Sequence, residues 1–154
     1  MPTHYSTQLT LVRAGKRSEQ TSQGDTKALM WDYVVPAATN PIADLIVLGL
    51  LPAGARLQGG RESHSAMGAS ATGAISLYVA SGPDLTDLGA AVASSDLQAA
   101  VTYTSAGTNV IGLTEATLLY YVTLTPVLLV TTVAGAAFPA AGTLKGHIDY
   151  AVAH

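Results

Sequence analysis

Two pairs of ionisable residues have the spacing that a metal site on a β-sheet would need. Glu62 and His64 stand two residues apart, as do His147 and Asp149. Residues two apart on a strand point to the same face, so neighbouring strands could hold two imidazoles and two carboxylates around a divalent cation. Alternation gives a simpler explanation, because it places all four side chains on a solvated sheet face. We therefore expect no metal site here.

Short motifs of common enzymes are missing from the sequence. There is no G-x-S-x-G nucleophile turn, and "GASATG" at residues 68–73 lacks the lysine of a phosphate-binding loop. Asp84 and Asp87 are explained by turn or helix-capping positions. The chain has no cysteine, which excludes disulfides and thiolate chemistry. We therefore expect no catalytic residues, no cofactor and no enzymatic activity.

The charge content is unusually low for a chain of 154 residues. Asp, Glu, Lys and Arg make up 11% of it, against about 25% in an ordinary soluble domain. This composition suits a protein that packs against other proteins, although a neutral, soluble surface is the alternative. The net charge of −3 provides no basic field for nucleic acid or an anionic membrane. The longest apolar run, Leu118–Val130, is too short to cross a bilayer.

Alternation of apolar and polar residues is the main pattern along the chain, and it predicts strands. One segment, Ile42–Leu51, is apolar on both faces, which indicates a central strand or one covered by a neighbouring subunit. The expected strands are Tyr5–Leu11, Leu29–Val35, Ile42–Leu51, Arg56–Met67, Ile75–Val79, Val101–Thr104, Asn109–Gly112, Leu118–Leu124, Val127–Val133 and Leu144–Val152.

Turn residues separate these strands. In "LPAGARL", Pro52 suits the second position of a type I turn and Gly54 the fourth. Gly59 and Gly60 indicate a bulge or a close approach of two backbones. Residues 105–108 indicate the turn of a hairpin between the strands on either side.

These elements predict a single all-β domain over residues 1–154, an antiparallel β-sandwich with jelly-roll-like topology. Residues 13–26 have no apolar period and are expected to form an exposed polar loop. Residues 84–100 are expected to form a variable insertion with one short helix that Asp84 caps.

Candidate partner-binding residues fall in three places. Arg13, Lys16 and Arg17 hold nearly half of the basic residues, so their loop could contact an acidic partner or serve solubility alone. Val47 is an outward position of the apolar segment. Tyr120 and Tyr121 point to opposite faces of one expected strand, so one of them meets solvent, an insertion or a partner.

Three stretches resemble one family of structural proteins. "LPAGARLQGG", "SAMGASATGAISLYVAS" and "VTTVAGAAFPAAGTLKGHIDYAV" are similar to segments of head decoration, or cement, proteins of tailed bacteriophages, and the resemblance covers Leu29–Val152. It implies a jelly-roll-like domain, often a trimer, that binds the major capsid protein on the outside of the virion and ties capsomers together. Synthesis in the host cytoplasm is expected.

The alternative is a head-fibre base or a carbohydrate-binding β-sandwich module. In that reading Trp31 or Tyr120 would lie beneath a sugar ring, whereas the regular alternation of Trp31 and Tyr33 favours a place in the core.

Overall fold

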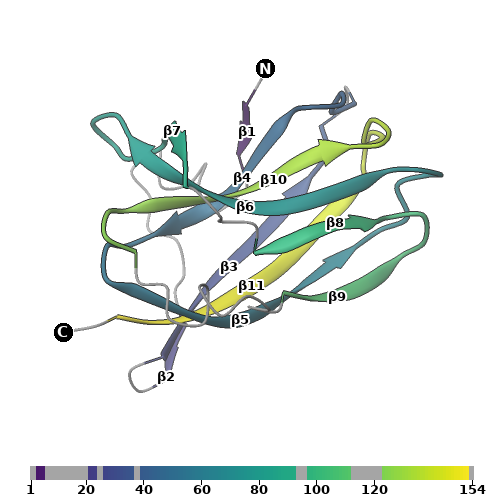
Figure 1. Ribbon diagram of the computed structural model, residues 1–154. Coiled ribbons are helices and arrows are strands. Elements are labelled where there is room, and N and C mark those ends of the chain that lie inside the picture. Colours follow the sequence, from purple (N-terminus) through teal and green to yellow (C-terminus); the bar gives the residue numbers. More distant parts are fainter. Residues whose placement is uncertain are drawn as a thin grey trace.

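The computed structural model describes residues 3–5, 21–23 (backbone only), 26–36, 39–92, 97–111 and 123–152. In these residues the protein is all-β, with two sheets lying face to face and no helix (Figure 1). None of them forms a helix long and apolar enough to cross a membrane.

The six-stranded sheet has the order β1-β4-β10-β6-β7, and β8 pairs with the other end of β6. The β1–β4 pair is parallel, and every other pair in the sheet is antiparallel. Its strands are β1 (Thr3–Tyr5), β4 (Leu45–Leu51), β6 (Thr72–Ser81), β7 (Asp87–Ala91), β8 (Gln98–Thr102) and β10 (Val127–Ala134).

The five-stranded sheet is antiparallel throughout, in the order β2-β3-β11-β5-β9. Its strands are β2 (Thr21–Gln23), β3 (Thr26–Val34), β5 (Ala55–His64), β9 (Gly107–Ile111) and β11 (Thr143–Val152).

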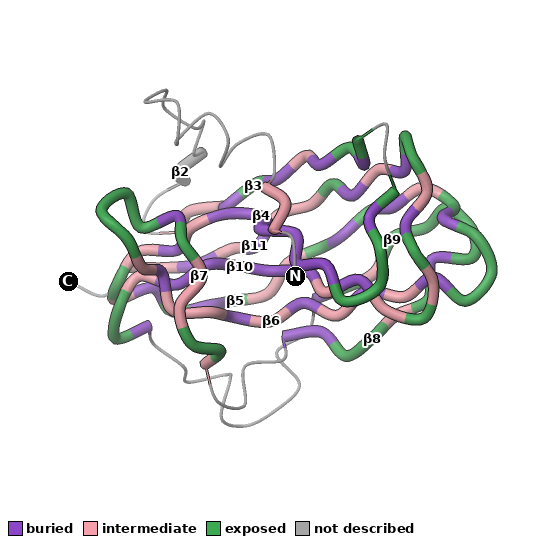
Figure 2. The backbone as a smooth tube through the Cα atoms, turned by 90° about the horizontal axis from the view of Figure 1, so that it is seen from above, coloured by how far each residue is buried: buried purple, intermediate pink, exposed green. Residues whose placement is uncertain are grey.

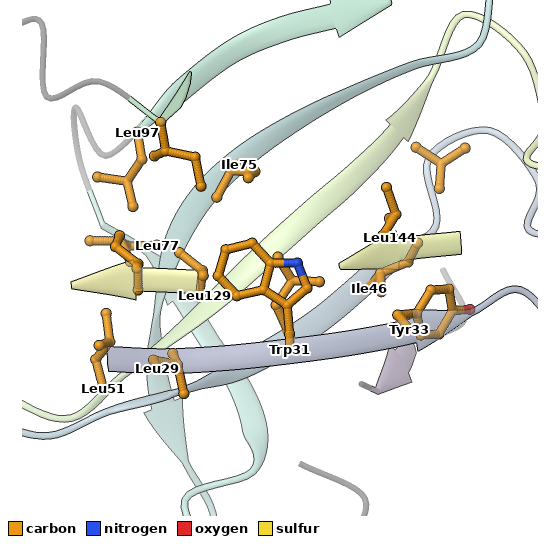
Figure 3. Close-up of a cluster of buried hydrophobic side chains, with 14 of the residues drawn as sticks. Leu29, Trp31, Tyr33, Ile46, Leu51, Ile75, Leu77, Leu97, Leu129 and Leu144 are labelled. Atoms are coloured by element: carbon orange, nitrogen blue, oxygen red, sulfur yellow. The ribbon is translucent and has the colours of Figure 1, made fainter. Parts of the chain in front are cut away.

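One apolar layer between the sheets forms the core, and both inner faces contribute to it. Trp31 stands in the middle of this layer, with aliphatic side chains around it (Figure 3). Burial of each large apolar side chain contributes roughly 1.5–3 kcal/mol. The cluster includes Leu29, Trp31, Tyr33, Ile46, Leu51, Ile75, Leu77, Leu97, Leu129 and Leu144.

Most of the expected strands that fall within the described residues are confirmed. β3, β4, β5, β6, β10 and β11 lie where the sequence pattern placed them, and β4 is buried on both faces over most of its length, as its apolar run predicted. Of the first expected strand, only its start at Tyr5 is described, as the last residue of β1. Most of Leu118–Leu124 lies outside the described residues.

The turn in "LPAGARL" exists, but its positions are shifted. The Ala55 amide donates to the Pro52 carbonyl at 3.3 Å, so Pro52 takes the first position and Gly54 the third. Gly54 has φ +79°, the left-handed value that the third position of a type II turn requires. The turn connects β4 to β5 and therefore carries the chain from one sheet to the other.

Both expectations for Gly59 and Gly60 are confirmed. The pairing of β5 with β11 shifts register beside Gly59, whose φ is +127°. A Cβ on Gly60 would overlap the carbonyl oxygen of His147, so the two backbones approach closely there.

The helix expected in residues 84–100 is wrong. Asp87–Ala91 form β7 and Gln98–Thr102 form β8, and both strands pair with β6. One edge of β6 pairs with β10, and the opposite edge offers free backbone hydrogen-bonding groups at both ends of the strand. Pairing with that edge satisfies the backbone of this weakly amphipathic segment better than an isolated short helix would.

The hairpin expected around residues 105–108 is also wrong. β8 pairs with β6 and β9 pairs with β5, so the two strands belong to different sheets. Local sequence identifies a turn here but cannot say which strands will accept the hydrogen bonds on either side of it.

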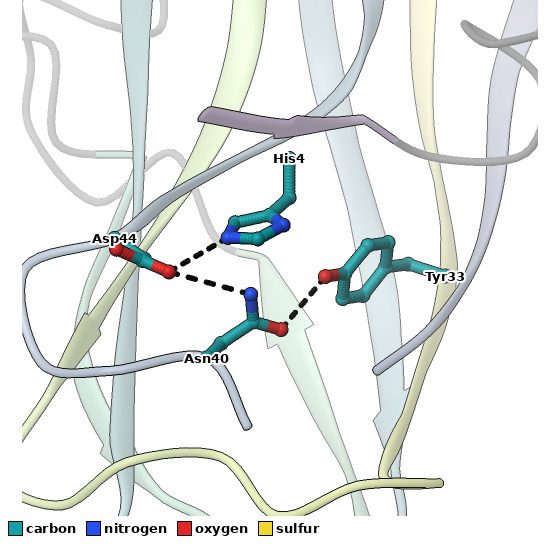
Figure 4. Close-up of polar contacts among 4 residues, drawn as sticks. All are labelled: His4, Tyr33, Asn40 and Asp44. Carbon is teal, nitrogen blue, oxygen red and sulfur yellow. Dashed lines mark hydrogen bonds and ion pairs between the residues drawn. The ribbon is translucent and has the colours of Figure 1, made fainter. Parts of the chain in front are cut away.

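A buried hydrogen-bond network attaches β1 to the core (Figure 4). His4 Nε2 lies 2.7 Å from an Asp44 carboxylate oxygen, and Asn40 donates to the same oxygen at 3.4 Å. The Tyr33 hydroxyl donates to the Asn40 side-chain carbonyl at 2.7 Å. Burial raises the pKa of Tyr33 to about 12, while its bond to Asn40 opposes that rise.

Replacing Asn40 by alanine is expected to destabilise the protein. The change leaves the Tyr33 hydroxyl and the buried Asp44 carboxylate each short of a partner, which costs about 1–3 kcal/mol. Urea unfolding at neutral pH measures the loss. Thr39→Ala, at the exposed neighbouring position, is the control and should change the free energy of unfolding by less than about 0.5 kcal/mol. Equal stability of both variants would contradict a structural role for the network.

Candidate interaction surface

The outer faces of the two sheets differ in kind. The outer face of the six-stranded sheet carries a second apolar cluster, made of Leu45, Val47, Ala80, Leu128 and Val130. Partly buried side chains from β1 and β7, among others, pack against it. In Figure 2 the tube is purple along much of β4 and β10, whereas green marks the loops at both ends of the sandwich. This face is therefore already covered within the chain.

The outer face of the five-stranded sheet is open and mostly polar. Its outward positions are the alternate residues of β3, β11, β5 and β9, and many of these side chains reach solvent. Met30 is 45% exposed and Val110 is 69% exposed, so apolar groups lie among the polar ones. We treat this face as the candidate interaction surface.

A hollow of about 470 Å³ lies on this face, over β3, β11, β5 and β9. Its lining combines basic, acidic, hydroxyl and apolar groups, which suits contact with a protein surface better than binding of one strongly charged ligand. The lining residues are Met30, Trp31, Asp32, Arg61, Ser63, Thr108, Lys145, Gly146 and His147.

Polar contacts across this hollow are those of a solvated surface. Lys145 Nζ lies 3.2 Å from an Asp32 carboxylate oxygen, and both side chains are about half exposed. The hydroxyls of Ser63 and Thr108 lie 2.8 Å apart. Exposed pairs of this kind contribute roughly 0–1 kcal/mol each, so these groups can exchange partners when another surface arrives.

The four residues weighed as a metal site do not come together. His147 and Asp149 lie on the open outer face, with His147 Nε2 4.0 Å from an Asp149 carboxylate oxygen. Glu62 and His64 point inward and are buried. No group of three or more His, Asp or Glu side chains in the described part of the chain could hold a metal ion. The expectation that all four side chains are solvated is therefore wrong for Glu62 and His64.

The bulge at Gly59 explains this difference. Ala55 and Leu57 point into the core, and strict alternation from them would turn Glu62 and His64 outward. The extra residue at the bulge shifts the phase by one, so the even-numbered positions after it point inward. The two glycines are the sequence signal that could have revealed the shift.

Glu62 is consequently a carboxyl group in the core. It is 1% exposed, and neither of its oxygens has a hydrogen-bond partner of good geometry. Burial raises the pKa of Glu62 to about 7, and the neighbouring Tyr103 hydroxyl opposes that rise in part. The Tyr103 ring packs against the His64 ring in a tilted arrangement, with the ring centroids 4.3 Å apart. Burial, and then the charge of Glu62, raise the pKa of Tyr103.

Stability should fall as the pH rises through the range in which Glu62 ionises only in the unfolded chain. Its pKa is raised from 4.5 to about 7, so the native state keeps the proton while the unfolded state releases it. Between pH 4.5 and 7 the free energy of unfolding is expected to drop by on the order of 3 kcal/mol, and above pH 7 this contribution becomes constant.

Urea unfolding at several pH values tests this expectation. Glu62→Gln should abolish the drop, because glutamine cannot ionise. Asp84→Asn, at an exposed turn, is the control and should leave the drop in place. A Glu62→Gln profile parallel to that of the wild type would refute the assignment.

Most of the partner-binding residues expected from the sequence cannot be placed. Arg13, Lys16, Arg17, Tyr120 and Tyr121 lie outside the described residues. Val47 does point outward from its sheet, but it is fully buried in the second apolar cluster. In the segment expected to be a polar loop, residues 21–23 form strand β2 beside β3.

Trp31 does not fit a sugar platform. Its side chain is 2% exposed and belongs to the core. Gly146, opposite it on β11, leaves room for the indole ring, because a Cβ at that position would overlap the ring.

Comparison with known proteins gives a match in structure and none in sequence. No protein-family model matches the chain, and no curated protein sequence matches it. Among solved structures, a chain from "Capsid of Ralstonia phage GP4" aligns over 99% of both chains, with a TM-score of 0.72 and 19% identity. A chain from "Cyanophage Pam1 capsid asymmetric unit" aligns over 91% of this chain and 96% of its own, with a TM-score of 0.47 and 19% identity. The GP4 match shows that this chain shares its fold.

Proposed function

We propose that the protein is a non-enzymatic structural component of a phage virion, a decoration or cement protein on the outside of the head. The observation that carries the proposal is the fold that the chain shares, over 99% of both chains, with a chain of the Ralstonia phage GP4 capsid. The three sequence stretches that resemble cement proteins support it independently.

The strand order supports a single jelly-roll domain. Leaving aside β1, β2 and β7, eight strands remain, and they pair as β3-β11-β5-β9 and β4-β10-β6-β8. Successive strands alternate between the two sheets except at β6 and β8, which are neighbours in one sheet. Two four-stranded sheets connected in this way describe a jelly roll.

The outer face of the five-stranded sheet is the surface that we assign to the contact with the shell. The opposite outer face is already packed with apolar side chains, whereas this face is open and has a hollow about 470 Å³ in volume. Its mixed polar character suits a modest interface with the major capsid protein. Repetition over a lattice converts a modest interface into high avidity.

In this proposal the protein is made in the host cytoplasm and ends on the virion surface. It acts as a homo-oligomer that links neighbouring capsomers, for which the sequence resemblance implies a trimer. Cement activity of this kind requires no catalytic or metal chemistry, because the work is done by binding to the assembled lattice.

Capsid stability tests the proposed function. Saturating amounts of the protein should raise the temperature at which mature capsids release DNA, since a ligand at a hundred times its dissociation constant stabilises its partner by about 2.7 kcal/mol. Binding to expanded shells should exceed binding to precursor shells, because the lattice spacing to be bridged exists only after expansion. Capsids that behave identically with and without the protein would show that the decoration role is wrong.

A matched pair of variants tests the assigned surface. Met30→Asp places a charge beside the hollow, whereas Leu85→Asp makes the same change in a turn next to the other sheet. The two side chains are similarly exposed, Leu85 at 37% and Met30 at 45%. Only Met30→Asp should weaken capsid binding, by about tenfold or more. Equal binding by both variants would place the contact elsewhere.

A further inference from the structure

Two edge strands of the sandwich, β8 and β9, are free of charged side chains. They lie at the edges of the two sheets on the same side of the sandwich, and Figure 1 shows them one above the other. The whole stretch from Gln98 to Ile111, which contains both strands and the turn between them, has no Asp, Glu, Lys, Arg or His.

Of these two edge strands, β9 is the one that belongs to the sheet with the open outer face. It pairs with β5, and within the described residues no strand pairs with its other side. Thr108 and Val110 project onto the outer face of the five-stranded sheet, and Val110 is the more prominent of the two, at 69% exposed.

An uncharged, exposed edge strand is a template for pairing with another strand. Proteins that remain monomeric protect such edges with lysine, proline, bulges or a covering segment. At the edge of the other sheet, by contrast, β1 is fixed by the His4–Asp44 contact. Nothing of that kind protects β9 among the described residues.

We propose that β9 pairs in antiparallel fashion with β9 of a second copy of this chain. Self-pairing brings neutral residues opposite neutral residues, so no like charges meet. In a register centred on Asn109, Val110 of each copy lies opposite Thr108 of the other, and Val110 loses much of its exposure to water. The five-stranded sheets then join into one continuous sheet across the dimer.

The symmetry of this pairing fits a protein that binds a shell. Two identical antiparallel strands are related by a two-fold axis perpendicular to their sheet. Both open faces therefore point in the same direction, and both hollows can contact one surface at once. This step rests on the proposed function, whereas the pairing itself rests on the edge strand. The edge favours a dimer as the basic unit, in place of the trimer that the resemblance implies.

The oligomeric state of the free protein tests the pairing. Native mass spectrometry and light scattering should detect a concentration-dependent dimer, with a dissociation constant on the order of 1–100 µM, since one edge buries a small interface. The double variant Thr108→Lys/Val110→Lys brings lysines opposite lysines across the axis and should weaken the dimer by about tenfold or more.

A matched control separates edge pairing from charge alone. Met30→Lys/Val34→Lys adds the same two charges to the same sheet face, at exposed positions of β3 away from this edge, and should dimerise as the wild type does. Thermal unfolding of both variants checks that they fold. A wild-type monomer up to about 1 mM, a trimer, or a dimer that tolerates the lysines at positions 108 and 110 would overturn the proposal.

The capsid experiment distinguishes this proposal from the proposed function. A chain that dimerises through β9 but leaves capsids unaffected keeps the edge contact and loses the cement role. A chain that stabilises capsids as a monomer or trimer keeps the cement role and loses the β9 contact.

Discussion

The structure depends on one apolar layer between two sheets, because each strand can supply only alternate side chains to it. Every strand must therefore stay in phase with the layer along its length. The bulge at Gly59 shifts this phase by one residue, so Glu62 faces the layer instead of the outer surface. With charged residues at only 11% of the chain, burial of this layer provides most of the drive to fold.

The same constraint explains how much of the fold the sequence predicts. Alternation located β3, β6 and β11 well, because in each of these strands buried residues alternate with more exposed ones around a central apolar residue. Those central residues are Trp31, Leu77 and Ile148. Pairing partners were less accessible. The turn after β8 has the composition of a hairpin, but the strands on its two sides join different sheets. Within residues 84–100, Asp87–Ala91 and Gln98–Thr102 form strands because β6 offers an edge, and their own sequence carries little record of that neighbour.

The candidate surface was less predictable than the fold. The sequence directed attention to basic and aromatic residues, most of which lie outside the described part of the chain, and to Val47, which is buried. The open face is defined by contrast with the buried outer face of the other sheet, and that contrast depends on how the strands pair and which side chains they turn outward. Residue types at single positions do not contain this information.

Buried Glu62 also has a kinetic consequence. At 1% exposure its carboxyl group is expected to exchange a proton with bulk water chiefly when the surrounding strands open transiently. After a sudden change of pH, the titration of this group would therefore proceed at the rate of that local opening rather than at the rate of proton diffusion. The rate at which Glu62 titrates would then report the rate at which the sandwich opens locally.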